Sequence, residues 1–238
     1  MEKFQPVNSP KITDLIIDQI REAILNGEVK PSEKLPPERE LVSRFKASRV
    51  AVREALKNLE ASGLLVIKPG SGVFVAETDS KTMSGSLYSI LRMEKTSLNE
   101  VTEARLIFEP IVARLAAERM SDEDVRLLEA NVKKTEKVLK ENRPTTAENV
   151  EFHSLVAGSV HNTVVSLTMK TLLDVAQVMT IETHDNVKER FDISYRSYKQ
   201  HKSLLRAFRQ RDPEKAYKLM FEHIAEIQTA LKKAIPEK

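Results

Sequence analysis

Three of the five histidines occur in a pattern that suits a metal ion. His153, His201 and His223 each lie on the apolar face of a separate predicted helix, so all three side chains are expected to point inward. Neutral imidazole is a common ligand of Zn, Ni, Mn and Fe. Asn149 precedes His153 by four residues on the same helical face and could add an oxygen ligand. The alternative is three core histidines that hydrogen-bond to backbone or acidic groups.

Arg105 is a second residue whose position suggests chemistry. It lies on the mostly apolar face of its predicted helix, and a buried guanidinium without an anion is costly. Glu109, four residues later, could be its ion-pair partner. Alternatively, Arg105 could hold a carboxylate ligand with two parallel hydrogen bonds, beside the metal. The sequence leaves both interpretations open.

Basic residues gather between Lys34 and Arg53, where six Lys or Arg side chains stand against two Glu. Such an excess is typical of a surface that binds nucleic acid, although a solvated pair of helices can show it too. Arg49 and Arg53 lie one helical turn apart near the start of a predicted helix. From there they could reach base edges or phosphates if that end enters the major groove.

The elements expected around these arginines form a helix-turn-helix followed by a hairpin. Ser48 is a natural N-cap for the helix that carries Arg49, and Gly63 is expected to close that helix. The Gly-rich turn 68–72 is expected to join two short strands. The predicted helices run from Ile12 to Asn26-Gly27, from 37 to 45 and from 49 to 62, and the predicted strands cover 64–67 and 73–75.

Beyond a polar linker at 77–81, helical periodicity continues to the end of the chain. The sequence therefore predicts a mainly α protein, with a winged helix-turn-helix domain over 1–76 and an all-α bundle of six or seven helices over 82–238. The predicted helices of the bundle lie at about 87–92, 97–120, 121–141, 145–160, 163–187, 195–211 and 213–234.

Composition excludes several classes of protein. The chain has no cysteine, which rules out a disulfide scaffold, a cysteine zinc site and a thiol nucleophile. No apolar stretch is expected to approach the ~18–20 residues that span a bilayer, and no signal-peptide core occurs near the N-terminus. We therefore expect a cytoplasmic protein with no membrane partner. No Glu-x-x-His pair and no His-Glu-x-x-His motif accompanies the histidines, which argues against an enzyme.

The first third of the chain resembles a known DNA-binding domain. The residues P-x-E-R-E-L, S-R-x-x-V-R-E-A-L and G-x-G-x-F-V, spread over about 10–76, are similar to the winged helix-turn-helix of GntR-type bacterial transcription regulators. For Arg39, an ion pair with a neighbouring glutamate is the alternative to a DNA contact. The resemblance implies that operator DNA is contacted by Arg39, Arg49, Arg53 and Gly70, and that Ser48 can bind a phosphate as well as cap its helix.

The remainder resembles the FCD ligand-binding domain of the FadR subfamily of these regulators, over most of 97–226. The resemblance rests on N-V-E-F-H, on H-K-S-L-L-R-A-F-R-Q-R-D-P-E-K-A, on M-F-E-H-I and on E-x-R-x-x-x-E-P. It implies a divalent ion held by three histidines, here His153, His201 and His223, and by an aspartate whose position Asn149 occupies. A neutral amide oxygen is a weaker donor than a carboxylate. We expect zinc first, with Ni, Mn or Fe as alternatives.

These observations together predict a homodimeric transcription regulator. The dimer would place two recognition helices in successive major grooves of a palindromic operator. A small organic acid, bound at the metal with Arg105, would modulate operator binding, and we expect it to relieve repression. The alternatives are a helical metalloenzyme with a DNA-binding arm, a dimerisation domain with a purely structural metal, and an acyl-CoA sensor.

Overall fold

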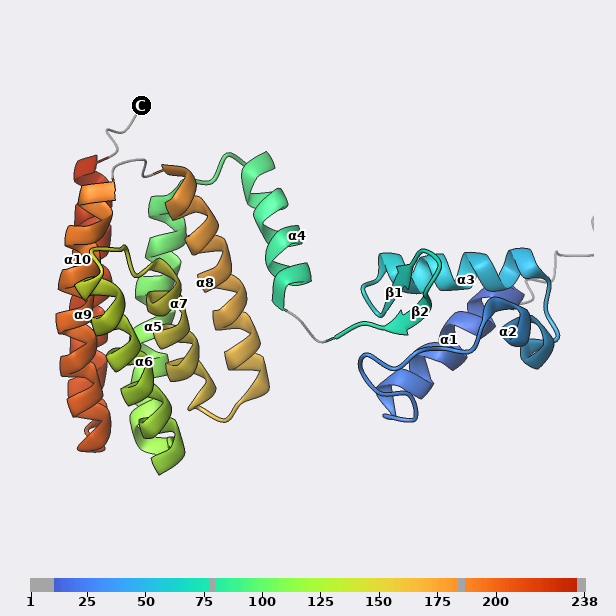
Figure 1. The fold of residues 1–238 in the computed structure, drawn as a ribbon, viewed down its shortest axis with the longest axis horizontal. Coiled ribbons are helices and arrows are strands. Elements are labelled where there is room, and N and C mark those ends of the chain that lie inside the picture. The colour runs from blue at the N-terminus through green and yellow to red at the C-terminus, as the bar shows by residue number, and fades with distance from the viewer. Residues whose placement is uncertain (1–10, 78–79, 184–186, 235–238) are drawn as a thin grey trace, which may run out of the picture. The chain divides into compact units, whose positions relative to one another are not determined.

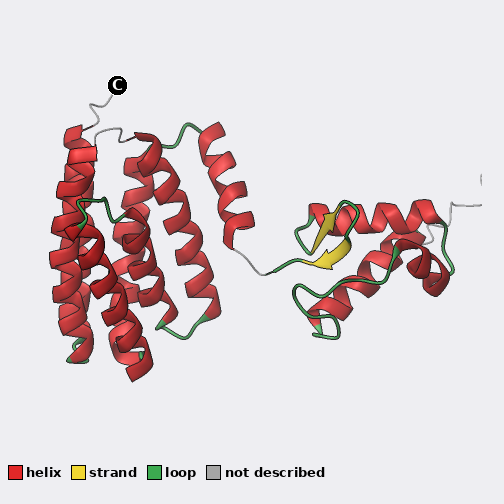
Figure 2. Ribbon diagram, viewed as in Figure 1, coloured by secondary structure: helices red, strands yellow, loops and turns green. Residues whose placement is uncertain are grey.

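The structure, a computed structural model, describes residues 11–77, 80–183 and 187–234. Over these residues it is mainly helical, with one two-stranded sheet, which confirms the expected fold class (Figure 2). The chain divides into two compact units, Met1–Asp79 and Ser80–Lys238, each with its own hydrophobic core.

The first unit is a three-helix assembly with a hairpin (Figure 1). The Ser48 hydroxyl accepts a hydrogen bond from the Ala51 N–H and so caps α3, as predicted. Gly63, with φ of +75°, ends that helix. The hydrophobic core of the first unit includes Ile16 of α1, Val52 of α3 and Leu65 of the hairpin. The elements are α1 (Ile12–Leu25), α2 (Glu38–Phe45), α3 (Arg49–Ala61), β1 (Leu65–Lys68) and β2 (Gly72–Val75).

The hairpin pairs β1 with β2 in antiparallel register, with Leu65 opposite Val75 and Lys68 opposite Gly72. The first strand begins one residue later than predicted, because the Leu64 N–H donates to the Leu59 carbonyl and belongs to the end of α3. Lys34, from the connection before α2, forms an isolated bridge with Phe74. The wing is therefore attached to the rest of the unit along one edge.

The second unit is a helical bundle in which α5 packs along α10 (Figure 1). Both α5 and α6 begin with a capping box, in which Ser97 pairs with Glu100 and Ser121 with Asp124. Phe152 and Phe208 are among the largest fully buried side chains of its core. The helices are α4 (Ser80–Met93), α5 (Leu98–Arg119), α6 (Asp122–Lys140), α7 (Thr146–Gly158), α8 (Thr163–Thr183), α9 (Val187–Arg209) and α10 (Pro213–Ala234).

Two helix starts differ from the prediction by several residues. Helix α4 begins at Ser80, inside the predicted linker 77–81, and is longer than the expected helix at 87–92. Helix α9 begins at Val187 rather than near 195. The sequence over 188–194 begins with the good helix formers Lys188, Glu189 and Arg190 but has no apolar stripe, so periodicity missed about two helical turns. In addition, α8 ends at Thr183 rather than at 187, and residues 184–186 of that predicted helix lie outside the described residues.

Helix α8 corrects the expectation that no apolar stretch is long enough to span a membrane. By length and composition alone, residues 163–182 pass that test. In the structure this helix packs against α4, α5 and α7. It contributes Met169 and Leu173 to the main core of the bundle and Val175 to a second apolar cluster, and 33% of the apolar window is buried.

Candidate metal centre and nucleic-acid interface

The three predicted histidines meet inside the bundle. His153 comes from α7, His201 from α9 and His223 from α10, and each is at most 2% exposed. The Nε2 atom of His223 lies 3.2 Å from that of His153 and 3.3 Å from that of His201. One ring nitrogen from each histidine lies within 4.8 Å of the others. Three helices distant in sequence thus bring three imidazoles to one point.

Neighbouring groups fix which ring nitrogens carry the protons. The Nδ1 atom of His223 lies 2.6 Å from the Gln200 side-chain oxygen, which can only accept, so this Nδ1 is the donor. The Nδ1 atom of His153 contacts the Glu109 carboxylate in the same way. In the neutral rings, the Nε2 atoms of His153 and His223 therefore carry lone pairs that face each other.

Two lone pairs at this separation repel unless a cation lies between them. Nitrogen ligands about 2.0–2.1 Å from a single ion stand about 2.8–3.4 Å apart in tetrahedral or octahedral geometry. The two Nε2 separations that involve His223, 3.2 and 3.3 Å, agree with this requirement, and the three ligand nitrogens lie within 4.8 Å of one another. His201 is held by stacking on Phe152, with ring centroids 3.8 Å apart. The donor set therefore fits a divalent transition-metal ion.

The electrostatics favour neutral imidazoles at this point. Burial, together with the neighbouring histidines, lowers the pKa of His201 and of His223 well below the ordinary value of 6.5. Both rings are therefore neutral near pH 7. Neutral imidazole is the form that binds a metal.

Glu109 links the histidines to Arg105. Its side chain is 3% exposed, its Oε1 lies 2.6 Å from the Arg105 Nε, and its Oε2 contacts His153. Burial raises the pKa of Glu109, but the neighbouring Arg105 guanidinium and the contact with His153 outweigh this effect and lower the pKa to about 2. The ion pair between Arg105 and Glu109, one of the two interpretations that the sequence left open, is present. The contact with His153 was not predicted, because it depends on how α5 packs against α7.

Arg105 also lines a cavity of about 90 Å³. Its Nη2 atom is buried and has no hydrogen-bond partner among the described residues, and the same holds for the Asn149 Oδ1. The remaining lining is mostly small and hydroxylated: Thr102, Thr145, Thr146, Thr180, Ser194 and Ser197, with Ile193, Ile227, Ala230 and Leu231. Two residues that line the cavity thus each have an unpaired buried atom, a donor on Arg105 and an acceptor on Asn149.

Helical register places this cavity beside the histidines. Asn149, Ser197 and Ile227 line it, and each lies four residues from His153, His201 or His223 on its own helix. A separation of four residues is about one turn, or roughly 6 Å along the axis. The cavity therefore lies about one turn from the histidine layer.

The predicted DNA-contacting residues lie on the surface of the first unit. Arg39, Ser48, Arg49 and Arg53 are exposed, as is Gly70 at the turn of the hairpin. Glu38 pairs with Arg53 at 3.0 Å, which ties α2 to α3. Glu40 pairs with Arg44, so both glutamates near Arg39 have other partners and no ion pair of Arg39 occurs within the described residues.

Two further cations lie beside the wing. The Lys68 ammonium sits 4.9 Å from the centre of the Phe74 ring, and the Lys34 ammonium 5.8 Å from it. Neither lysine was predicted from the sequence as a site residue. For Lys34 the reason is that its bridge with Phe74 joins residues forty positions apart. Lysines in these positions extend the positive surface toward the hairpin turn.

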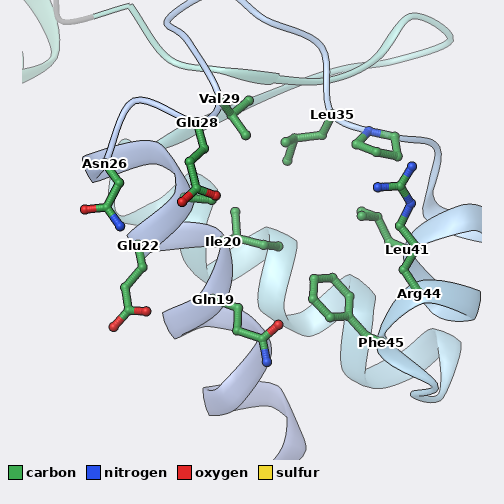
Figure 3. A pocket seen from close by; sticks show the side chains of 12 residues that line it. Gln19, Ile20, Glu22, Asn26, Glu28, Val29, Leu35, Leu41, Arg44 and Phe45 are labelled. Carbon is green, nitrogen blue, oxygen red and sulfur yellow. The ribbon is translucent and has the colours of Figure 1, made fainter.

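The first unit also contains a larger, open cavity of about 500 Å³ between α1 and α2 (Figure 3). Glu22 and Glu28 line it on the side of α1, and Arg44 on the side of α2. None of the predicted DNA-contacting residues lines this cavity. Its acidic rim does not suit a phosphate backbone.

Comparison with protein families gives two matches that divide the chain in the same way as the structure. Residues 12–75 match the family described as bacterial regulatory proteins, gntR family. Residues 100–226, more than half of the chain, match the FCD domain.

Individual relatives agree with this. The chain is 29% identical over 225 residues to the HTH-type transcriptional repressor NanR of Salmonella schwarzengrund, covering 92% of this chain and 84% of that protein. It is 29% identical over 223 residues to the NanR of Enterobacter sp. (strain 638), at 92% and 85% coverage. A solved structure of a GntR protein from Streptococcus agalactiae shares the fold with a TM-score of 0.75, at 23% identity, covering 92% of this chain and 99% of that one.

Proposed function

The chain belongs to the GntR family of bacterial regulatory proteins and carries an FCD domain, and we propose that it is a transcriptional repressor controlled by a divalent metal ion and a small carboxylate. Membership of this family makes it a regulator rather than an enzyme. In this proposal the first unit binds operator DNA in the cytoplasm, and the second unit binds the two effectors.

The DNA-binding part of the proposal assigns different roles to the exposed residues of the first unit. Arg49 and Arg53 point from the first two turns of α3 and would read base edges. Arg39, Ser48 and the backbone at Gly70 would bind phosphates and fix the orientation. In the absence of DNA, Glu38 holds the Arg53 side chain.

The metal part rests on one observation, the convergence of the three histidine Nε2 atoms. His153, His201 and His223 would hold the ion, and Asn149 could add a neutral oxygen. Imidazole ligands suit zinc first, and also nickel, manganese or iron. When bound, the ion supplies a Lewis-acidic position for an oxygen of the effector.

The effector part rests on the cavity beside the histidines. The unpaired Nη2 atom of Arg105 is a donor for a carboxylate oxygen, and the hydroxylated walls suit a small polar acid. A cavity of about 90 Å³ is too small for a long acyl chain, which argues against an acyl-CoA sensor.

We also propose that the repressor acts as a homodimer, because a palindromic operator offers two half-sites. An exposed apolar stripe on α5 is a candidate for the subunit interface: Ile107, Phe108 and Ile111 are each about half exposed. Clustered apolar residues on a surface are a common mark of protein–protein contact.

Binding to DNA tests this proposal. A duplex selected from random sequences by the wild-type protein serves as the operator, and fluorescence anisotropy measures its affinity. Each base-reading arginine is worth about 1–3 kcal/mol, so Arg49→Ala and Arg53→Ala should each weaken specific binding by roughly 5- to 150-fold. Zinc with a small acid should weaken wild-type binding.

The matched control is Arg21→Ala. Arg21, whose side chain is 42% exposed, is also an arginine of the first unit in an ion pair, with Asp18 at 2.7 Å, but it lies outside the DNA-contacting set. Its replacement should leave the affinity unchanged. Equal binding by the wild type, Arg49→Ala and Arg53→Ala would refute the assignment of α3. A metal and an acid that bind without changing operator affinity would leave the ion a structural role.

A further inference from the structure

We propose that the ion and the carboxylate bind cooperatively, because this chain supplies no net negative charge to the buried metal centre. The inference deepens the proposed function and rests on it. It concerns how the two effectors depend on each other.

The charges around the centre can be counted directly. The available ligands, three histidines and Asn149, are all neutral. Glu109 is the anion nearest to them, but the buried Arg105 guanidinium pairs with it and cancels its charge. Arg105 is also the only charged side chain among the described residues that line the adjoining cavity. A divalent ion would therefore leave the loaded centre with a net charge of +2.

A buried charge without a counter-charge is unfavourable, because the low dielectric of the interior replaces its hydration poorly. The ion consequently binds less tightly alone than together with an anion that offsets its charge. A carboxylate in the cavity can accept a hydrogen bond from the free Nη2 atom of Arg105. It can also lower the net charge of the centre to +1.

The dependence must be mutual. If an acid strengthens binding of the ion by some factor, the ion strengthens binding of the acid by the same factor. The acid alone would meet only Arg105, whose charge is already shared with Glu109. The repressor would thus respond to the two effectors together.

The neutral side chain of Asn149 makes binding of the ion depend on the acid. Asn149 lies one turn from His153, and its Oδ1 atom is buried without a partner among the described residues. An aspartate there has nearly the same shape and carries the missing negative charge. Asn149→Asp should therefore bind the ion well without an acid.

The test is a zinc titration of the untagged full-length protein, by competition with a chromophoric chelator. It is run without additive, with acetate, lactate or citrate, and with acetamide as a neutral isostere of acetate. We expect at least one acid to raise wild-type zinc affinity by about 5- to 150-fold, the usual range of coupling between sites. Acetamide should have no effect. In Asn149→Asp the zinc affinity without acid should rise. The ratio of zinc affinity with acid to zinc affinity without acid should fall toward one.

The control is Asn162→Asp, which adds the same charge at the start of α8. There the Asn162 side-chain oxygen caps the N–H groups of Val164 and Val165, a role that aspartate fills equally well. This variant should behave as the wild type.

The outcomes separate the two proposals. Tight zinc binding that no acid strengthens would overturn the cooperativity and leave the metal centre intact. An enhancement that Asn149→Asp retains in full would overturn the role of Asn149. No zinc binding with or without acid would refute the metal centre itself. The wild-type comparison needs no variant, so it holds even if Asn149→Asp fails to fold.

Discussion

At the scale of single residues, Glu109 organises the centre although it is not one of the predicted ligands. Its carboxylate contacts the Nδ1 side of His153 and the Arg105 guanidinium, so it fixes an imidazole and an anion-binding group at once. A carboxylate behind a ligating histidine sets the ring orientation and raises the basicity of the other nitrogen. In the proposed function, Glu109 would therefore be a positioning residue for both effectors.

Replacing Glu109 by Gln should have two effects. The buried Arg105 loses its counter-charge, which should lower the free energy of unfolding of the metal-free protein by about 3–5 kcal/mol in urea titrations. Zinc affinity should fall by about 10- to 100-fold, because His153 loses the carboxylate that positions it. The control is Glu214→Gln, because the Glu214 side chain is 77% exposed in its pair with Arg114. Equal stability of both variants would contradict the role of Glu109.

At the scale of elements, helix caps and apolar periodicity predicted most of the helices that carry the site residues. Ser48 and Gly63 delimit α3 as expected from the sequence, and the three histidines lie on the inner faces of α7, α9 and α10. The early start of α9 was missed, because no apolar stripe marks residues 188–194. Periodicity shows which face is buried but not where a polar helix begins.

Contacts between elements were less accessible to sequence reasoning. Glu109 was recognised as a partner of Arg105 because four residues separate them, but its contact with His153 crosses from α5 to α7. The bridge that brings Lys34 to the wing and the pairing of Glu38 with Arg53 are likewise tertiary. A single sequence shows neighbours along a helix, whereas neighbours across helices depend on packing.

At the scale of the whole molecule, the proposed homodimer would place two copies of α3 on one operator, so the subunit interface would be part of the function. The exposed apolar stripe on α5 is the candidate for this subunit interface. Its residues recur at positions i, i+1 and i+4, and so occupy one face of the helix.

Phe108→Glu should therefore separate the dimer, because an ionised side chain at a closed apolar interface is strongly unfavourable. Light scattering after size-exclusion chromatography should give the mass of one chain, and operator affinity should fall with it. Leu127→Glu is the control, since Leu127 of α6 is 44% exposed and lies outside the stripe. A dimer that survives Phe108→Glu would place the interface elsewhere.

The central claim is that His153, His201 and His223 hold an ion. It is tested most directly by elemental mass spectrometry of the untagged protein and two histidine variants. We predict about one transition-metal ion per chain in the wild type and in His161→Ala, because His161 is exposed and pairs with Asp124. His201→Ala should lose the ion. A wild type without metal that takes up none when it is added, or a His201→Ala variant that keeps its full metal content, would contradict the account.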